Sequence, residues 1–167
     1  AVSVDNSPIG AFALADSLKE DSLQAIQRLH QHNIDVVMMS GDQQSVVDYV
    51  AQQVGVKTAQ GNCSPRDKAT YIERLRQQGK VVAMVGDGVN DAPALAMANV
   101  SFAMKSGSDV AEQTASATLM QHSVNQLVDG LMISRATLKN IKQNLFFALI
   151  YNVLGIPLAA LGYLSPV

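Results

Sequence analysis

The sequence predicts an α/β fold in which a doubly wound parallel sheet is followed by a long helix that enters a membrane. Three observations predict it. Short apolar runs alternate with stretches of helical period, as expected of strands joined by helices. The run Val81–Val85 is apolar throughout, which is typical of a central parallel strand buried on both faces. Residues 145–164 contain no charged side chain, and this uncharged run is longer than any before it.

The elements follow in order along the chain. Apolar runs of strand length, several followed by Gly or Asp, predict the strands, and apolar residues spaced three and four apart predict the helices. The expected strands cover residues 9–15, 34–39, 81–85, 100–103 and 117–120. The expected helices cover residues 17–32, 43–54, 65–78, 91–98, 109–115 and 127–143.

The composition changes after residue 122. About twenty uncharged residues are enough to cross a lipid bilayer as a helix, although Gly155 and Pro157 keep a buried core helix open as an alternative. Basic residues such as Lys139 and Lys142 precede the span and predict that the α/β domain lies in the cytoplasm. We therefore expect an α/β domain, a connecting helix and a transmembrane segment, over residues 1–122, 123–143 and 144–167.

Composition excludes several classes of function. The chain has 167 residues, 48% hydrophobic and 16% charged, so it can bury a core and is not disordered. A net charge of −2 without a basic stripe argues against nucleic-acid binding. Cys63 is the single cysteine, which leaves no internal disulfide framework. The sequence begins without Met or a leader pattern and reads as part of something longer.

The segment 84–93, Met-Val-Gly-Asp-Gly-Val-Asn-Asp-Ala-Pro, is the strongest functional signal. Gly86 and Gly88 allow the backbone to approach a ligand closely. Asp87 and Asp91 supply the oxygen donors that Mg²⁺ prefers. The alternative is a solvated acidic turn, but the whole pattern favours a loop where a hard cation and a phosphoryl group meet.

Two weaker motifs complete a candidate site. Ser40, Gly41 and Asp42 follow another expected strand, so they should reach the same edge of a parallel sheet. The hydroxyl of Ser40 and the N–H of Gly41 could bind a phosphoryl oxygen, and Lys68 near a helix start could neutralise its charge. Taken singly, each motif is equally compatible with a plain turn or a solvated lysine.

Together these motifs resemble the second half of the phosphorylation domain of P-type ATPases, within the haloacid-dehalogenase-like superfamily. The resemblance implies that Asp87, with Asp91, binds Mg²⁺ and that Asn90 and Asp91 organise the phosphate site and its water. Lys68 would steady the phosphoryl group. Ser40 to Asp42 would replace the family's usual Thr-Gly-Asp, and the cofactors would be Mg²⁺ and ATP.

The membrane segment is similar to the penultimate span of copper(I)-exporting ATPases of the bacterial cytoplasmic membrane. The resemblance implies that its Tyr151-Asn152 pair helps to bind transported Cu⁺ or Ag⁺, together with a Cys-Pro-Cys span outside this chain. Zinc and cadmium exporters tend to carry Lys in this span, and this chain has none. Interhelical hydrogen bonding is the alternative role for the pair.

The family's phosphorylated Asp-Lys-Thr-Gly-Thr segment does not occur in the sequence. The resemblance therefore implies that the partner is the N-terminal part of the same ATPase, which supplies this segment, the nucleotide domain and the Cys-Pro-Cys helix. Alone, the chain should not turn over ATP. Two alternatives stay open: a membrane-anchored phosphatase of the same superfamily, and a non-catalytic truncated product that serves as an interaction or metal-handling module.

Overall fold

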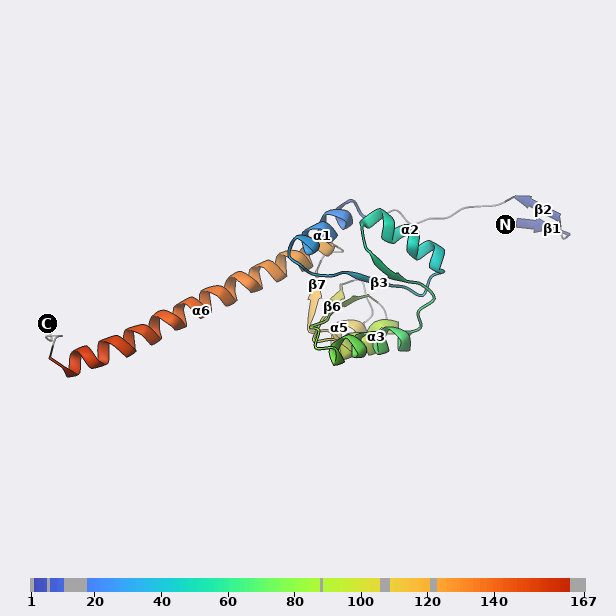
Figure 1. The fold of residues 1–167 in the computed structure, drawn as a ribbon. Coiled ribbons are helices and arrows are strands. Elements are labelled where there is room, and N and C mark those ends of the chain that lie inside the picture. Colours follow the sequence, from blue (N-terminus) through green and yellow to red (C-terminus); the bar gives the residue numbers. More distant parts are fainter. Residues whose placement is uncertain are drawn as a thin grey trace. The chain divides into compact units, whose positions relative to one another are not determined.

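The computed structural model describes residues 2–5, 7–10, 18–87, 89–105, 109–120 and 123–162. The chain divides into two compact units, residues 1–123 and 124–167. Among the described residues, the first unit holds the seven strands and five of the six α-helices, and the second holds one long helix. Figure 1 draws both units.

The first unit alternates strands and helices as expected. Its helices are α1 (Glu20–Gln31), α2 (Gln44–Val54), α3 (Pro65–Gln77), α4 (Ala92–Met97) and α5 (Asp109–Thr114). Its strands are β1 (Val2–Val4), β2 (Ser7–Gly10), β3 (Val37–Met39), β4 (Thr58–Gln60), β5 (Ala83–Gly86), β6 (Val100–Met104) and β7 (Ala117–Leu119).

The strands that follow α1 form two parallel sheets. One pairs β3 with β4, and the other has the order β5-β6-β7. Among the described residues, β3 and β5 each pair with a single neighbour and so keep one open edge. The carboxyl ends of β3 and β5 lead directly into the two loops that the sequence marks as functional.

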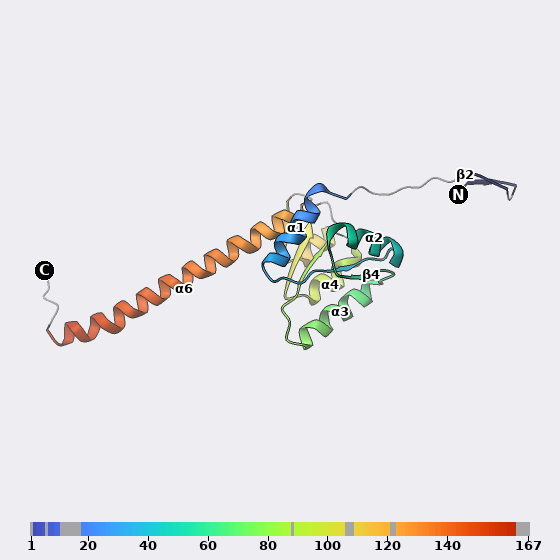
Figure 2. The same cartoon turned by 45° about the horizontal axis from the view of Figure 1, so that its top comes forward.

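The core of the β5-β6-β7 sheet is small. Leu95 of α4, Ala103 of β6 and Ala111 of α5 are almost completely buried, and Met84 of β5 packs against them. Figure 2 shows α3 and α4 close together, and these two helices share many contacts. Helix α2 buries an apolar stripe through Val47, Ala51 and Val54, whereas Val46, expected on the same side, is 50% exposed.

One expectation about strands is corrected, and another is tested only in part. Residues 9 and 10 of the strand expected at 9–15 belong to β2, which pairs antiparallel with β1, whereas residues 11–15 lie outside the described residues. The strand expected at 81–85 begins two residues later, where pairing with β6 starts at Ala83, and Val81 is 84% exposed. Strand β5 therefore is not covered on both faces along the expected length.

The second unit is helix α6 (Val124–Ala160), 37 residues long with Pro157 inside it. Among the described residues it is the one helix that is long and apolar enough to cross a membrane, judged by length and composition. None of its most apolar stretch is buried within the protein. This exposure argues against the core-helix alternative, because a core helix would be mostly covered.

Candidate functional site

The loop after β5 folds tightly back on the strand. Gly86, the last residue of β5, is buried, and Asp87 after it is exposed. The short 3₁₀ helix η1 (Val89–Asp91) then leads into α4. A Cβ atom on Gly86 would lie 2.7 Å from Cβ of Asp91 and 2.8 Å from its Oδ2. Glycine is therefore required here for close approach, and the carboxylate of Asp91 lies against the strand end.

Asp91 is paired with a lysine from a distant element. Its Oδ1 lies 2.8 Å from Nζ of Lys68 in α3, and the two side chains are only 11% and 15% exposed. A mostly buried carboxylate needs such a partner, because burying an unpaired charge is strongly unfavourable. The ion pair joins the start of α3 to the loop after β5, which are two of the three places where the sequence predicts phosphate-site residues.

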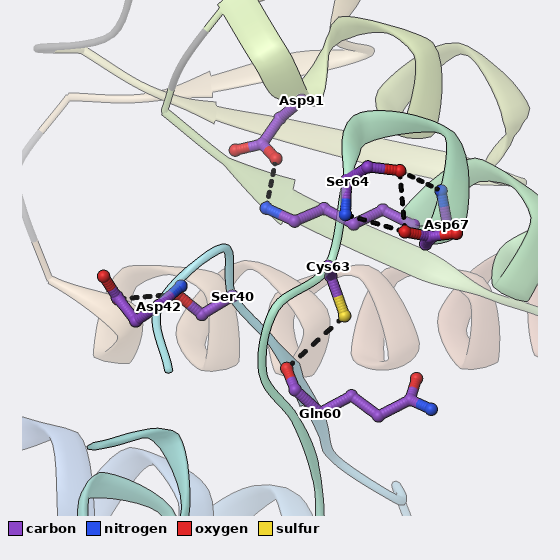
Figure 3. A network of polar contacts seen from close by, with 8 residues as sticks. Ser40, Asp42, Gln60, Cys63, Ser64, Asp67 and Asp91 are labelled. Carbon is purple, nitrogen blue, oxygen red and sulfur yellow. Dashed lines mark hydrogen bonds and ion pairs between the residues drawn. The ribbon is translucent and has the colours of Figure 1, made fainter. Parts of the chain in front are cut away.

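A capping box fixes the helix turn that carries this lysine. The backbone N–H of Asp67 donates to Oγ of Ser64 at 3.2 Å, and the backbone N–H of Ser64 donates to Oδ2 of Asp67 at 2.8 Å (Figure 3). Hydrogen bonds from the Ser64 hydroxyl and backbone lower the pKa of Asp67 below its ordinary value. With Pro65 in the first turn, the helix start is well defined.

The loop after β3 holds the second group of expected residues. The hydroxyl of Ser40 donates to Oδ2 of Asp42 at 2.7 Å, and the backbone N–H of Asp42 donates back to the Ser40 oxygen at 3.3 Å (Figure 3). Ser40 is half-buried, whereas Gly41 and Asp42 are exposed. The loop therefore presents a hydroxyl whose orientation is set by its own aspartate.

The structure thus brings together some of the expected residues and leaves others apart. Lys68 and Asp91 form one pair, and Ser40 and Asp42 form another. Asn90 and Asp87 are exposed beside the first pair, while Gly88 lies outside the described residues. Tyr151 and Asn152 lie on α6, in the other unit, and both are exposed there, Tyr151 by 78%.

Sequence reasoning missed two features that organise this region. The Ser64–Asp67 capping box has a readable signal, because a Ser lies three residues before an acidic side chain at a helix start. The second feature is the contact of Gln44 with Gly61, residues 17 positions apart. This contact joins two segments that are distant in the sequence, so no local spacing of residues predicts it.

The carboxylates at the end of β5 could contribute ligands to a magnesium ion but do not form a complete site by themselves. Among the described residues, no group of three or more His, Cys, Asp or Glu side chains could hold a metal ion by itself. Asp87 and Asp91 lie four positions apart across one tight loop, and the absence of a side chain at Gly86 leaves room for the carboxylate of Asp91. Mg²⁺ is commonly bound by one or two carboxylates together with phosphate oxygens and water.

Comparison with known proteins identifies the family. Residues 1–99 match the haloacid dehalogenase-like hydrolase family. The chain belongs to this family, and the expected fold class is confirmed.

The more particular resemblance extends over the whole chain. It is 76% identical to a probable cation-transporting ATPase of Haemophilus influenzae over all 167 residues, which are 23% of that protein. It is 46% identical to a copper-exporting P-type ATPase of Bacillus subtilis over 99% of its length, which is 21% of that protein. The solved structure of a zinc-transporting PIB-type ATPase matches 90% of this chain, with a TM-score of 0.83 and 35% sequence identity. The match covers 24% of the chain of that ATPase.

These likenesses confirm the resemblance to heavy-metal P-type ATPases that the motifs indicate. The chain spans less than a quarter of the length of these three relatives. The relatives are named for transport of a cation, of copper and of zinc, so the class of cargo agrees among them while the particular metal differs.

Proposed function

We propose that this chain supplies the Mg²⁺-binding and phosphate-stabilising half of the aspartyl-phosphate site in a copper(I)-exporting P-type ATPase. The observation that carries the proposal is the Lys68–Asp91 ion pair at 2.8 Å. It joins a cationic group and a carboxylate at the carboxyl end of a parallel strand, where ligands of open α/β sheets gather.

The roles of the residues follow from their chemistry. Lys68 would neutralise charge on the phosphoryl group, and Ser40 with the N–H of Gly41 would donate hydrogen bonds to its oxygens. Asp87 and Asp91 would hold Mg²⁺, and the bound ion would screen the negative charge of the phosphate. Asn90 would orient water beside them. Phosphoryl transfer depends mostly on such positioning and charge neutralisation.

The phosphorylated aspartate would come from the N-terminal part of the same ATPase. Among the described residues, β3 and β5 each have an open edge, so a further parallel strand could pair there. Its carboxyl end would then reach the same edge of the sheet as Ser40 and Asp91. The exposure of Val81 beside β5 supports a covering element in that region.

Copper as the cargo is supported by sequence likeness and by the membrane helix. The chain is 46% identical to the copper-exporting ATPase of Bacillus subtilis and 35% identical to the zinc-transporting structure. Tyr151 and Asn152 on α6 would assist thiolate and thioether ligands from other spans, which are the donors that Cu⁺ prefers. We place α6 in the bacterial inner membrane and the first unit in the cytoplasm.

Phosphoenzyme formation tests the proposal. The chain in detergent micelles is incubated with Mg²⁺, Cu⁺ and ATP labelled at its γ-phosphate, alone and together with the separately expressed N-terminal part. We expect acid-stable label on the N-terminal part in the mixture only, and none when Lys68→Ala replaces the wild-type chain. Label on this chain itself would favour an autonomous phosphatase, and no label in the mixture would favour a non-catalytic module.

A further inference from the structure

We propose that Gln44 is a positioning residue for the phosphate site, because its side-chain amide fixes the loop that leads to Lys68 against the loop that carries Ser40. This inference rests on the proposed function and deepens it. It concerns a residue outside the motifs by which the site is recognised.

The amide of Gln44 is held at both ends. Its Oε1 accepts a hydrogen bond from the backbone N–H of Gly61 at 2.6 Å. Its Nε2 donates to Oδ1 of Asp48 at 2.7 Å and to the carbonyl of Ala59 at 3.3 Å. The opposite amide orientation would place a donor against the N–H of Gly61 and an acceptor against a carboxylate, so these partners select one orientation.

The two loops approach so closely that glycine is required at the contact. A Cβ atom on Gly61 would lie 2.6 Å from Cα of Gln44 and 2.8 Å from the carbonyl oxygen of Asp42. Both are backbone atoms, which cannot move aside as the end of a flexible side chain could. The first turn of α2 and the loop after β4 are therefore in direct backbone contact.

Backbone hydrogen bonds continue this contact up to the site. The N–H of Asn62 donates to the carbonyl of Asp42 at 2.6 Å, and the N–H of Cys63 donates to the carbonyl of Ser40 at 2.9 Å. Asn62 has a φ of +52°, a left-handed conformation that needs such support. Ser64 then caps the start of α3, and Lys68 lies in the first turns of this helix.

A short series of contacts thus connects Gln44 to the hydroxyl of Ser40 and to the helix that carries Lys68. On one side Gln44 is the first residue of α2, two positions after Asp42, whose carboxylate orients the Ser40 hydroxyl. On the other side it holds Gly61, four positions before Pro65, where α3 begins. Loss of the amide contact would leave the N–H of Gly61 without its partner and loosen the spacing between hydroxyl and ammonium.

The test replaces Gln44 by methionine, which has a similar length and no hydrogen-bonding amide. Gln53→Met, at an exposed glutamine in the last turns of the same helix, is the matched control. Amide hydrogen exchange is measured by NMR on the full chain in micelles. We expect exchange at Gly61 to become roughly tenfold faster in Gln44→Met, the effect of one lost hydrogen bond, and to be unchanged in Gln53→Met.

The second readout is phosphoenzyme formation in the mixture with the N-terminal part. We expect the maximal labelling rate of Gln44→Met to fall roughly tenfold while the half-saturating ATP concentration stays unchanged, since the nucleotide domain lies outside this chain. A global loss of structure would instead lower the amount of active protein and the melting temperature. Asp48→Ala, which removes one of the two acceptors of Nε2, is the second variant should Gln44→Met not fold, and it should shift both readouts in the same direction.

The outcomes separate this inference from the proposed function. Unchanged exchange at Gly61, or faster exchange with an unchanged labelling rate, would overturn the positioning role while leaving the proposed function intact. Absence of label with the wild-type chain would overturn the proposed function and, with it, the catalytic part of this inference. The exchange comparison alone would then decide whether the Gln44 contact exists.

Discussion

Lys68 and Asp91 are 23 positions apart in the sequence, yet Nζ of one lies 2.8 Å from Oδ1 of the other in a mostly buried ion pair. The pair connects α3 with the loop after β5, so each partner fixes the position of the other. A phosphoryl oxygen that approaches Lys68 would meet an ammonium group already oriented by a carboxylate. Pre-orientation of this kind lowers the cost of reaching the reactive geometry.

A double-mutant cycle measures the strength of this pair. Lys68→Met and Asp91→Asn should each lower the free energy of unfolding by roughly 1–3 kcal/mol, because each leaves a mostly buried polar partner unsatisfied. The double mutant should recover part of that loss, with a coupling energy of about 1–2 kcal/mol. Denaturant unfolding of the chain in detergent measures these values. Additive effects would show that the two side chains do not interact in solution, and the exposed Lys80→Met is the control.

Gly86→Ala should disturb the same pair from the other side. The added Cβ would lie 2.7 Å from Cβ of Asp91, which is not the flexible end of a side chain, so the loop must move. We expect a loss of roughly 1–3 kcal/mol in stability. Gly41→Ala is the control, because its Cβ would meet only the carbonyl oxygen of Cys63 at 3.7 Å. Thermal unfolding compares the two, and equal melting temperatures would contradict the predicted clash.

The sequence predicted the alternation of elements well, since most helices are long enough to show their period. It missed strand β4 (Thr58–Gln60), which has only three residues, Thr-Ala-Gln, of which the two polar ones are exposed. That strand is defined by its pairing with β3, a tertiary contact without a local pattern. The start of the strand expected at 81–85 was predicted wrongly for a related reason. Burial of Val81 would need a neighbouring element that the described residues do not provide.

In the candidate site, too, the sequence predicts the residues but not the contacts between them. The motifs around Ser40, Lys68 and Asp91 could be found from sequence because their residue types and order are specific. Their contacts could not, because an ion pair or an amide bridge between loops depends on how distant elements pack. The role of Gln44 in particular is visible only from the distances to Gly61 and Asp48.

The capping box should make stability depend on pH. The pKa of Asp67 is lowered in the folded state by its hydrogen bonds to Ser64, so the unfolded state binds the proton more tightly. The stabilisation is therefore present above the ordinary aspartate pKa of about 4 and is lost as the pH falls through the folded pKa. The melting temperature of wild type minus that of Asp67→Asn should be positive near neutral pH and shrink below about pH 4. A difference independent of pH would contradict the linkage, and Asp35→Asn is the exposed control.

Asp87→Asn tests the proposed magnesium site. Asp87 is exposed directly after β5, so the amide should fold normally and leave the melting temperature nearly unchanged. The loss of one negative oxygen donor should weaken the binding of Mg²⁺. We therefore expect the labelling rate in the two-part mixture to fall at least tenfold, which corresponds to about 1.4 kcal/mol. Part of the loss should be recovered at higher Mg²⁺ concentration. Full activity at the original Mg²⁺ dependence would show that this carboxylate does not hold the ion.

Asn152→Ala and Tyr151→Phe test the assignment of copper to α6. Both residues lie on the exposed surface of a helix that could span a membrane, where a polar side chain is unfavourable unless it has a function. In the two-part assembly in lipid vesicles, each change should reduce Cu⁺-dependent labelling several-fold and raise the half-saturating Cu⁺ concentration. Labelling in the reverse direction from inorganic phosphate, which needs no Cu⁺ at the membrane site, should be retained. Leu149→Ala, an exposed apolar position nearby, should leave both reactions unchanged. Equal loss of both reactions in the Asn152 and Tyr151 variants would point to a structural role of the pair in helix packing.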